Sequence, residues 1–112
     1  MWGNIPMMVR TGNHRVDVER PGFVTDAIGG RVNTFAVTKG NVRAWVQPAR
    51  ANVIEQYGAR DIAVSHSVFF YADPEVRIGD RLLHRGRYLL VRGMKNAGDI
   101  DRLWRVDCEE TH

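Results

Sequence analysis

The side chains with the greatest capacity for chemistry in this sequence are four histidines and one cysteine: His14, His66, His84, His112 and Cys108. None of the histidines lies at a metal-ligand spacing from another histidine or from Cys108, and the sequence has no CxxC or HExxH motif. We therefore expect no metal centre.

The segment Ser65-His66-Ser67 places a nucleophile beside a base. Successive side chains of a strand point to opposite faces, so we expect no direct nucleophile–base pair there. A small hydrolase built on Ser67, His66 and nearby acids is kept as a third hypothesis, and the first expectation is that the protein has no enzymatic activity and no cofactor.

Two further segments match ligand-binding loops only in part. "NAGDIDR" (96–102) spaces Asp99 and Asp101 like the start of a calcium loop but lacks its late glutamate, which favours a polar hairpin turn. "AIGGRVN" (27–33) is rich in glycine, but no lysine-Ser/Thr pair follows and the G-x-G-x-x-G fingerprint is missing. Neither segment indicates nucleotide or metal binding.

Arginine dominates the charge of the chain. The 112 residues carry a formal charge of +3, and only Lys39 and Lys95 among the 16 basic residues are lysines. Arginine suits phosphates and interfaces, although genomic base composition explains the same bias equally well. Basic strands with interleaved aromatic residues leave open a nucleic-acid-binding β-barrel as the alternative function; the aromatic residues concerned are Trp45, Phe69, Phe70, Tyr71, Tyr88 and Trp104. Against it, 13 carboxylates are interspersed with the basic residues.

Length and cysteine content limit the class of protein further. A chain of 112 residues fits a single domain. One cysteine cannot form an internal disulfide, which indicates an origin in the cytosol. No stretch approaches the roughly 20 apolar residues that cross a bilayer, so we expect no membrane partner.

The periodicity of apolar residues predicts an all-β fold, a small barrel or sandwich of about six short strands with one short helix. Alternating strands are predicted at 14–20, 42–48, 62–74 and 101–110, and a helix at 49–57. For this helix, Pro48 would stand at the first turn and Gly58 at a left-handed cap. Residues 1–13 lack periodicity and are expected to form an N-terminal arm, and the glycine-rich segment 21–41 a long mobile loop.

The segment "VRIGDRLLHRGRYLLVRG" (76–93) predicts a hairpin that is apolar on both faces. With a two-residue turn at Arg85-Gly86, Leu82 faces Leu89 on one side and Leu83 faces Tyr88 on the other. A three-residue turn shifts the pairs and still leaves apolar residues on both faces. One face needs the protein's own core, and the other needs a second cover.

The order of these segments over residues 14–110 resembles the head-tail joining proteins of long-tailed phages, also called head-closure or stopper proteins. The resemblance rests on an Asp-x-x-Gly-Gly segment, a Trp-containing strand ending in proline, a helix, a Gly-Asp-Arg step into a Gly-Arg-Tyr hairpin and a final strand with a cysteine followed by an acid. The matching positions are Asp26, Gly29, Gly30, Trp45, Pro48, Gly79, Asp80, Arg81, Gly86, Arg87, Tyr88, Cys108 and Glu109. The N-terminal segment "MWGNIPMMV" has no counterpart.

The resemblance implies a virion protein of the phage neck, assembled in the host cytoplasm as a cyclic homo-oligomer, a hexamer or dodecamer. Its partners would be the portal or adaptor ring, a tail terminator or tail tube protein, and packaged double-stranded DNA. Residues expected to contact the channel or adaptor are Phe23, Asp26, Gly29, Gly30, Arg31, Phe35 and Lys39. Residues expected at subunit contacts are Trp45, Arg81, Arg87, Tyr88 and Arg92.

Overall fold

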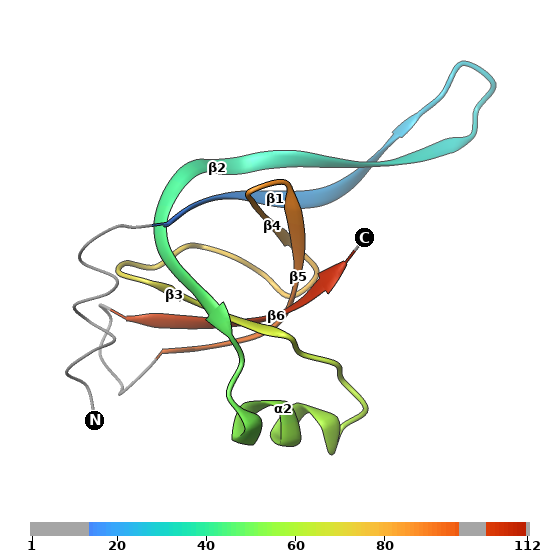
Figure 1. Ribbon diagram of the computed structural model, residues 1–112. Helices are drawn as coiled ribbons and strands as arrows, with labels where there is room; N and C mark the ends of the chain where they lie inside the picture. The colour runs from blue at the N-terminus through green and yellow to red at the C-terminus, as the bar shows by residue number, and fades with distance from the viewer. Residues whose placement is uncertain (1–13, 97–102, 112) are drawn as a thin grey trace.

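The computed structural model describes residues 14–96 and 103–111, which form a closed barrel with one helix beside it (Figure 1). The elements are β1 (His14–Thr25), β2 (Arg31–Pro48), α2 (Ala51–Gly58), β3 (His66–Phe70), β4 (Arg81–His84), β5 (Arg87–Asn96) and β6 (Trp104–Thr111). Around the barrel the strands follow the order β1-β2-β3-β6-β5-β4, and β4 closes the ring against β1. The all-β prediction with one short helix is confirmed.

The barrel core is built by alternation along each strand. Val16 and Val18 of β1 are buried with the inward side chains of the other strands, which include Ala44, Val68, Phe70, Leu82, Leu89, Val91, Val106 and Cys108. On the outer surface, Trp45 packs against Phe69 and Leu103 in a smaller apolar cluster. The outer face of β2 is therefore covered where the sequence places a tryptophan among polar residues.

The β4–β5 hairpin has the two-residue turn. Leu82 pairs with Leu89 and Leu83 pairs with Tyr88. Arg85 and Gly86 both have positive φ, 51° and 78°, as the type I′ turn of a tight hairpin requires. Leu82 and Leu89 lie in the core, and Leu83 and Tyr88 are half-buried outside it.

The segment 21–41 differs from the predicted loop in its backbone structure. Its residues continue β1 and β2 as a long antiparallel hairpin, with cross-strand pairs such as Pro21↔Phe35 and Val24↔Val32. Figure 1 shows this hairpin projecting from the barrel. Gly22 and Gly40 lie inside the strands. Counting glycines therefore overestimated the irregular part, which is confined to the tip at 26–30.

The helix predicted at 49–57 and the strand predicted at 62–74 have different bounds in the structure. The helix begins at Ala51, two residues after the expected start, because Pro48 ends β2 by pairing with His66. Gly58 lies within the helix, and Ala59 caps it in right-handed conformation (φ −63°) with its N–H donating to Glu55 O, so no left-handed glycine cap forms. The predicted strand 62–74 is shortened to β3. The arm 1–13, Asp99, Asp101 and His112 lie outside the described residues.

Candidate functional site

The projecting hairpin is the most exposed apolar element in the described part of the chain. On one face lie Phe23, Phe35 and Val37, whose exposed fractions are 58%, 38% and 56%; Val24 and Val32 are exposed on the other face. Ile28 at the tip is 92% exposed. An apolar surface of this kind, contiguous along one element, is typical of a site that contacts another macromolecule.

Asp26, Gly29 and Gly30 build the tip of the hairpin. Asp26 Oδ1 accepts hydrogen bonds from the backbone N–H groups of Ile28 (3.0 Å) and Gly30 (2.7 Å). Gly29 has a φ of 85°, and a Cβ at position 30 would lie 2.8 Å from the Asp26 carboxylate. These three residues, predicted as contacts to the channel or adaptor, therefore have a structural role in the turn that presents Ile28.

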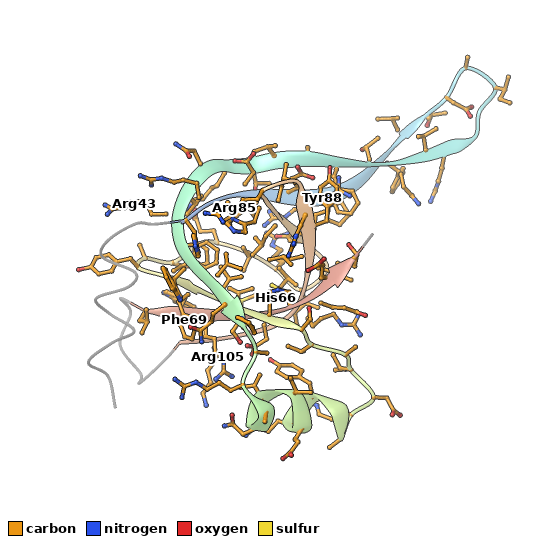
Figure 2. The ribbon with its side chains drawn as sticks, viewed as in Figure 1. Arg43, His66, Phe69, Arg85, Tyr88 and Arg105 are labelled. Atoms are coloured by element: carbon orange, nitrogen blue, oxygen red, sulfur yellow. The ribbon has the colours of Figure 1, made fainter. Side chains whose placement is uncertain are left out.

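Arg81 of β4 clamps the base of the hairpin to the barrel. Its Nε lies 2.7 Å from Glu19 Oε1 on β1. Its guanidinium carbon lies 3.7 Å from the ring centroid of Phe35 on β2 and 3.8 Å from that of Tyr88 on β5. Figure 2 shows Tyr88 beside β1, where the hairpin leaves the barrel. One planar cation thus joins four strands, which a more strongly hydrated lysine ammonium would do less well.

A second arginine, Arg20, holds the opposite side of the hairpin base. Its Nε and Nη2 donate to the two carboxylate oxygens of Asp80 at 3.2 and 3.1 Å, and this contact raises the pKa of Arg20. Asp80 is 2% exposed and also accepts the N–H of Arg77 at 2.9 Å. Gly79, with a φ of 98°, precedes it. The Gly-Asp-Arg step therefore supplies both the Asp80 and the Arg81 anchors of the hairpin.

The remaining predicted contact residues do not form one site. Arg31 lies over the ring of Phe23 at 4.5 Å, and Lys39 pairs with Glu75 at 2.6 Å, which lowers the pKa of Glu75. Trp45 lies elsewhere on the barrel, where it stacks on His14 with ring centroids 4.6 Å apart. Arg87 and Arg92 are at 3.7 and 3.9 Å from Glu110 and Glu109, respectively. Contacts of these residues with other subunits stay predictions.

A buried polar network that the sequence did not reveal attaches α2 to the barrel. Asp107, fully buried, accepts hydrogen bonds from Tyr57 Oη (2.8 Å), Ser67 Oγ (3.0 Å) and Arg105 Nε (3.2 Å). Arg105 lies on the side of the sheet that faces α2 (Figure 2). Burial and the bond to Asp107 raise the pKa of Tyr57 to about 12. The signal in the sequence was an aspartate between Val106 and Cys108 in a strand.

The expected separation of Ser65 and His66 is wrong. Ser65 Oγ lies 2.9 Å from His66 Nδ1, because Ser65 precedes β3 and is not bound by strand alternation. His66 Nε2 lies 3.8 Å from Glu110 Oε1. Ser65 Oγ also accepts the N–H of Glu110 at 2.8 Å, so the hydroxyl belongs to a link between β3 and β6. Ser67 points instead to Asp107.

Residues 14–96 and 103–111 contain no group of three or more potential metal ligands placed to hold an ion. Nor does this part of the chain include a helix long and apolar enough to cross a membrane.

The aromatic residues proposed for nucleic-acid stacking are mostly used elsewhere. Phe70 is fully buried and Phe69 is 5% exposed. Trp104 packs against the core, and Tyr88 lies against Arg81. Trp45 stacks on His14, and Tyr71 is 47% exposed. Within residues 14–96 and 103–111, these six aromatic residues therefore do not form the row of exposed rings that single-strand binding uses.

These features define a small closed β-barrel that carries a projecting apolar hairpin anchored at its base. The family model for phage head completion proteins matches residues 7–111. The chain belongs to this family, as its resemblance to head-tail joining proteins predicts, and it is a structural protein of the phage head–tail region.

Solved structures agree with this fold. Protein SF1141 from Shigella flexneri 2a, determined in solution, is similar with a TM-score of 0.70 at 14% identity, covering 88% of this chain and 91% of that one. A chain in the virion of a native gene transfer agent particle is similar with a TM-score of 0.56 at 15% identity, covering 88% and 94%. No curated protein matches the sequence.

Proposed function

We propose that the protein forms a ring in the phage neck between the portal or adaptor and the tail. In this position it closes the filled head, retains the packaged DNA and provides the surface on which the tail docks. The family and the likeness to a virion protein support this proposal. The observation that carries it is the projecting hairpin, on which Phe23, Val24, Ile28, Val32 and Val37 are each at least 45% exposed.

The hairpin is the element that we propose inserts into a neighbour. Its two anchors, Arg81–Glu19 and Arg20–Asp80, hold its base against the barrel, while Phe23, Val24 and Ile28 stand far from the core. A projecting element that is fixed at its base has less conformational entropy to lose on binding than a free loop has. The anchors therefore favour docking as a preformed unit.

Reconstitution tests this function. The purified protein is mixed with adaptor-bearing capsids, and the bound fraction is measured by sedimentation and negative-stain microscopy. We expect a closed ring at the neck, and we expect Phe23→Ser to abolish binding while the melting temperature stays within about 2 °C, because the side chain lies outside the core.

Ile78→Ser is the matched control, since Ile78 is 71% exposed and lies beside residues of α2 and β5. It should bind as the unchanged protein does. If the unchanged protein joins neither the capsid nor the tail, the proposed function is wrong. A monomer in isolation is compatible with it, because ring formation can require the capsid as template.

A further inference from the structure

A cavity lined by basic side chains opens at one end of the barrel, and no residue of the projecting hairpin lines it. It has a volume of about 330 Å³ and lies where β1 and β3 begin and where β4 turns into β5. The core residue Leu89 contributes to its lining, and the polar side chains around it are Gln47, His14, His66, His84, Arg85 and Arg87. The mouth of a small barrel is a frequent place for ligand binding.

Hydrogen bonds fix which ring nitrogens can donate. The N–H of Val46 donates to His14 Nδ1 at 2.8 Å, so neutral His14 carries its proton on Nε2. His84 Nδ1 lies 3.2 Å from the carbonyl oxygen of Arg15, an acceptor only, and therefore carries the hydrogen itself. The cavity thus has an imidazole donor at His14 without any change of protonation.

The charges around the cavity are mainly positive. No carboxylate lines it among the described residues, although Glu110 lies 3.7 Å from Arg87 and 3.8 Å from His66 at its edge. One carboxylate against two arginines leaves a net positive charge even with every histidine neutral. Burial lowers the pKa of His14, and the neighbouring His84 and Arg85 lower it further, as a positive environment requires.

We propose that this cavity binds a phosphate group, carried either by a free phosphate ion or by the end of a nucleic-acid strand. Arginine forks bind phosphate oxygens with charge-assisted hydrogen bonds, and a tetrahedral anion can accept bonds from donors on several walls at once. Arg85 and Arg87 belong to one wall, the β4–β5 hairpin, and His14 belongs to another, β1. The proposal is independent of the hairpin contacts and of ring formation.

Arg85 offers a variant that separates binding from folding. It occupies the first position of the Arg85-Gly86 turn with a φ of 51°, a conformation that asparagine adopts more readily than arginine. Arg85→Asn therefore creates the preferred Asn-Gly turn and is expected to leave the melting temperature unchanged or raised. At the same time it removes a positive charge from the cavity.

The test is a titration with inorganic phosphate at constant ionic strength and pH 7.5, followed by the histidine ring resonances in NMR spectra. We expect saturable shifts for His14 and His84 in the full chain. Loss of one charge-assisted bond should weaken the affinity of Arg85→Asn about tenfold or more. Arg60→Gln, an exposed substitution after α2, should bind like the unchanged protein.

The absence of saturable shifts in the unchanged protein overturns the proposal, and so does equal affinity in Arg85→Asn and the unchanged chain. A second titration uses a short oligonucleotide with and without a 5′-phosphate. If the phosphorylated strand binds more tightly than both the unphosphorylated strand and the free ion, the phosphate comes from nucleic acid. If the phosphorylated strand binds no more tightly than the free ion, the ligand is the free ion.

Discussion

The guanidinium carbon of Arg81 lies 3.7 Å from the ring centroid of Phe35, so a residue of the four-residue strand β4 holds the base of the projecting hairpin. The same guanidinium contacts Glu19 and Tyr88. The hairpin is thereby joined to the barrel by a contact that depends on the planar shape of the cation as well as on its charge.

Arg81→Lys should loosen the hairpin without unfolding the barrel. Lysine keeps the charge but loses the stacking on two rings, and we expect a stability loss of about 1 kcal/mol. Amide hydrogen exchange should become faster in residues 31–37 and stay unchanged in β3 and β6. Arg92→Lys, whose ion pair with Glu109 spans 3.9 Å, is the control and should change neither quantity. Uniform acceleration in all strands would contradict a local clamp.

Asp80→Asn should be considerably more destabilising. The asparagine amide cannot accept both Arg20 bonds and the Arg77 N–H, and it leaves the half-buried Arg20 guanidinium without its charged partner. We expect a loss of about 2–3 kcal/mol in urea unfolding. Asp73→Asn, in the same loop and exposed, should cost less than about 0.5 kcal/mol. Similar values for the two variants would show that the Arg20–Asp80 contact does not hold the loop.

Tyr57 should make the protein sensitive to alkaline pH. Its pKa is raised to about 12 in the folded state, whereas the unfolded chain loses this proton near pH ~10. Between these two values the unfolded state binds fewer protons, so stability falls as pH rises. Unfolding by urea at pH 9 and pH 11.5 measures this fall. Tyr57→Phe should reduce it; an identical pH dependence in both proteins would assign it to other groups.

Gly93 should tolerate no side chain. A Cβ at this position would collide with the hydroxyl of Tyr57 on α2. The register between β5 and β6 shifts just before Gly93. We expect Gly93→Ala to destabilise the protein by about 1–3 kcal/mol. The same substitution in a Tyr57→Ala background should cost clearly less, because the two positions are coupled. Strict additivity in this double-mutant cycle would rule out the collision as the cause.

The sequence predicted the all-β fold because apolar residues alternate along strands that bury Val16, Ala44, Leu82 and Val106, but it left a barrel and a sandwich open. It also predicted the hairpin at 81–90 with apolar residues on both faces, but it left a two-residue and a three-residue turn open; the structure has the two-residue turn at Arg85-Gly86. Periodicity is a property of local segments, and it is strongest where one face is fully buried.

Periodicity could not predict the two contacts that anchor the hairpin, Arg20–Asp80 and Arg81–Glu19. Arg20 and Asp80 are 60 positions apart, and Glu19 and Arg81 are separated by 62, so only the closed strand order brings them together. The segment 21–41 was expected to be a mobile loop because it contains four glycines and a proline. Its strands bury almost nothing, so the alternation that marks a half-buried strand is missing there. The role of Asp107 was missed for the same reason as the anchors, since its partners Tyr57 and Ser67 come from distant segments.

Cryo-electron microscopy of the neck of the assembled particle tests the central claim most directly. We predict a closed ring of this protein in which the hairpin side chains Phe23, Val24 and Ile28 are buried against a neighbouring subunit, the adaptor or the tail. Density for the protein with all its hairpins exposed to solvent, or its absence from the neck, would contradict the claim.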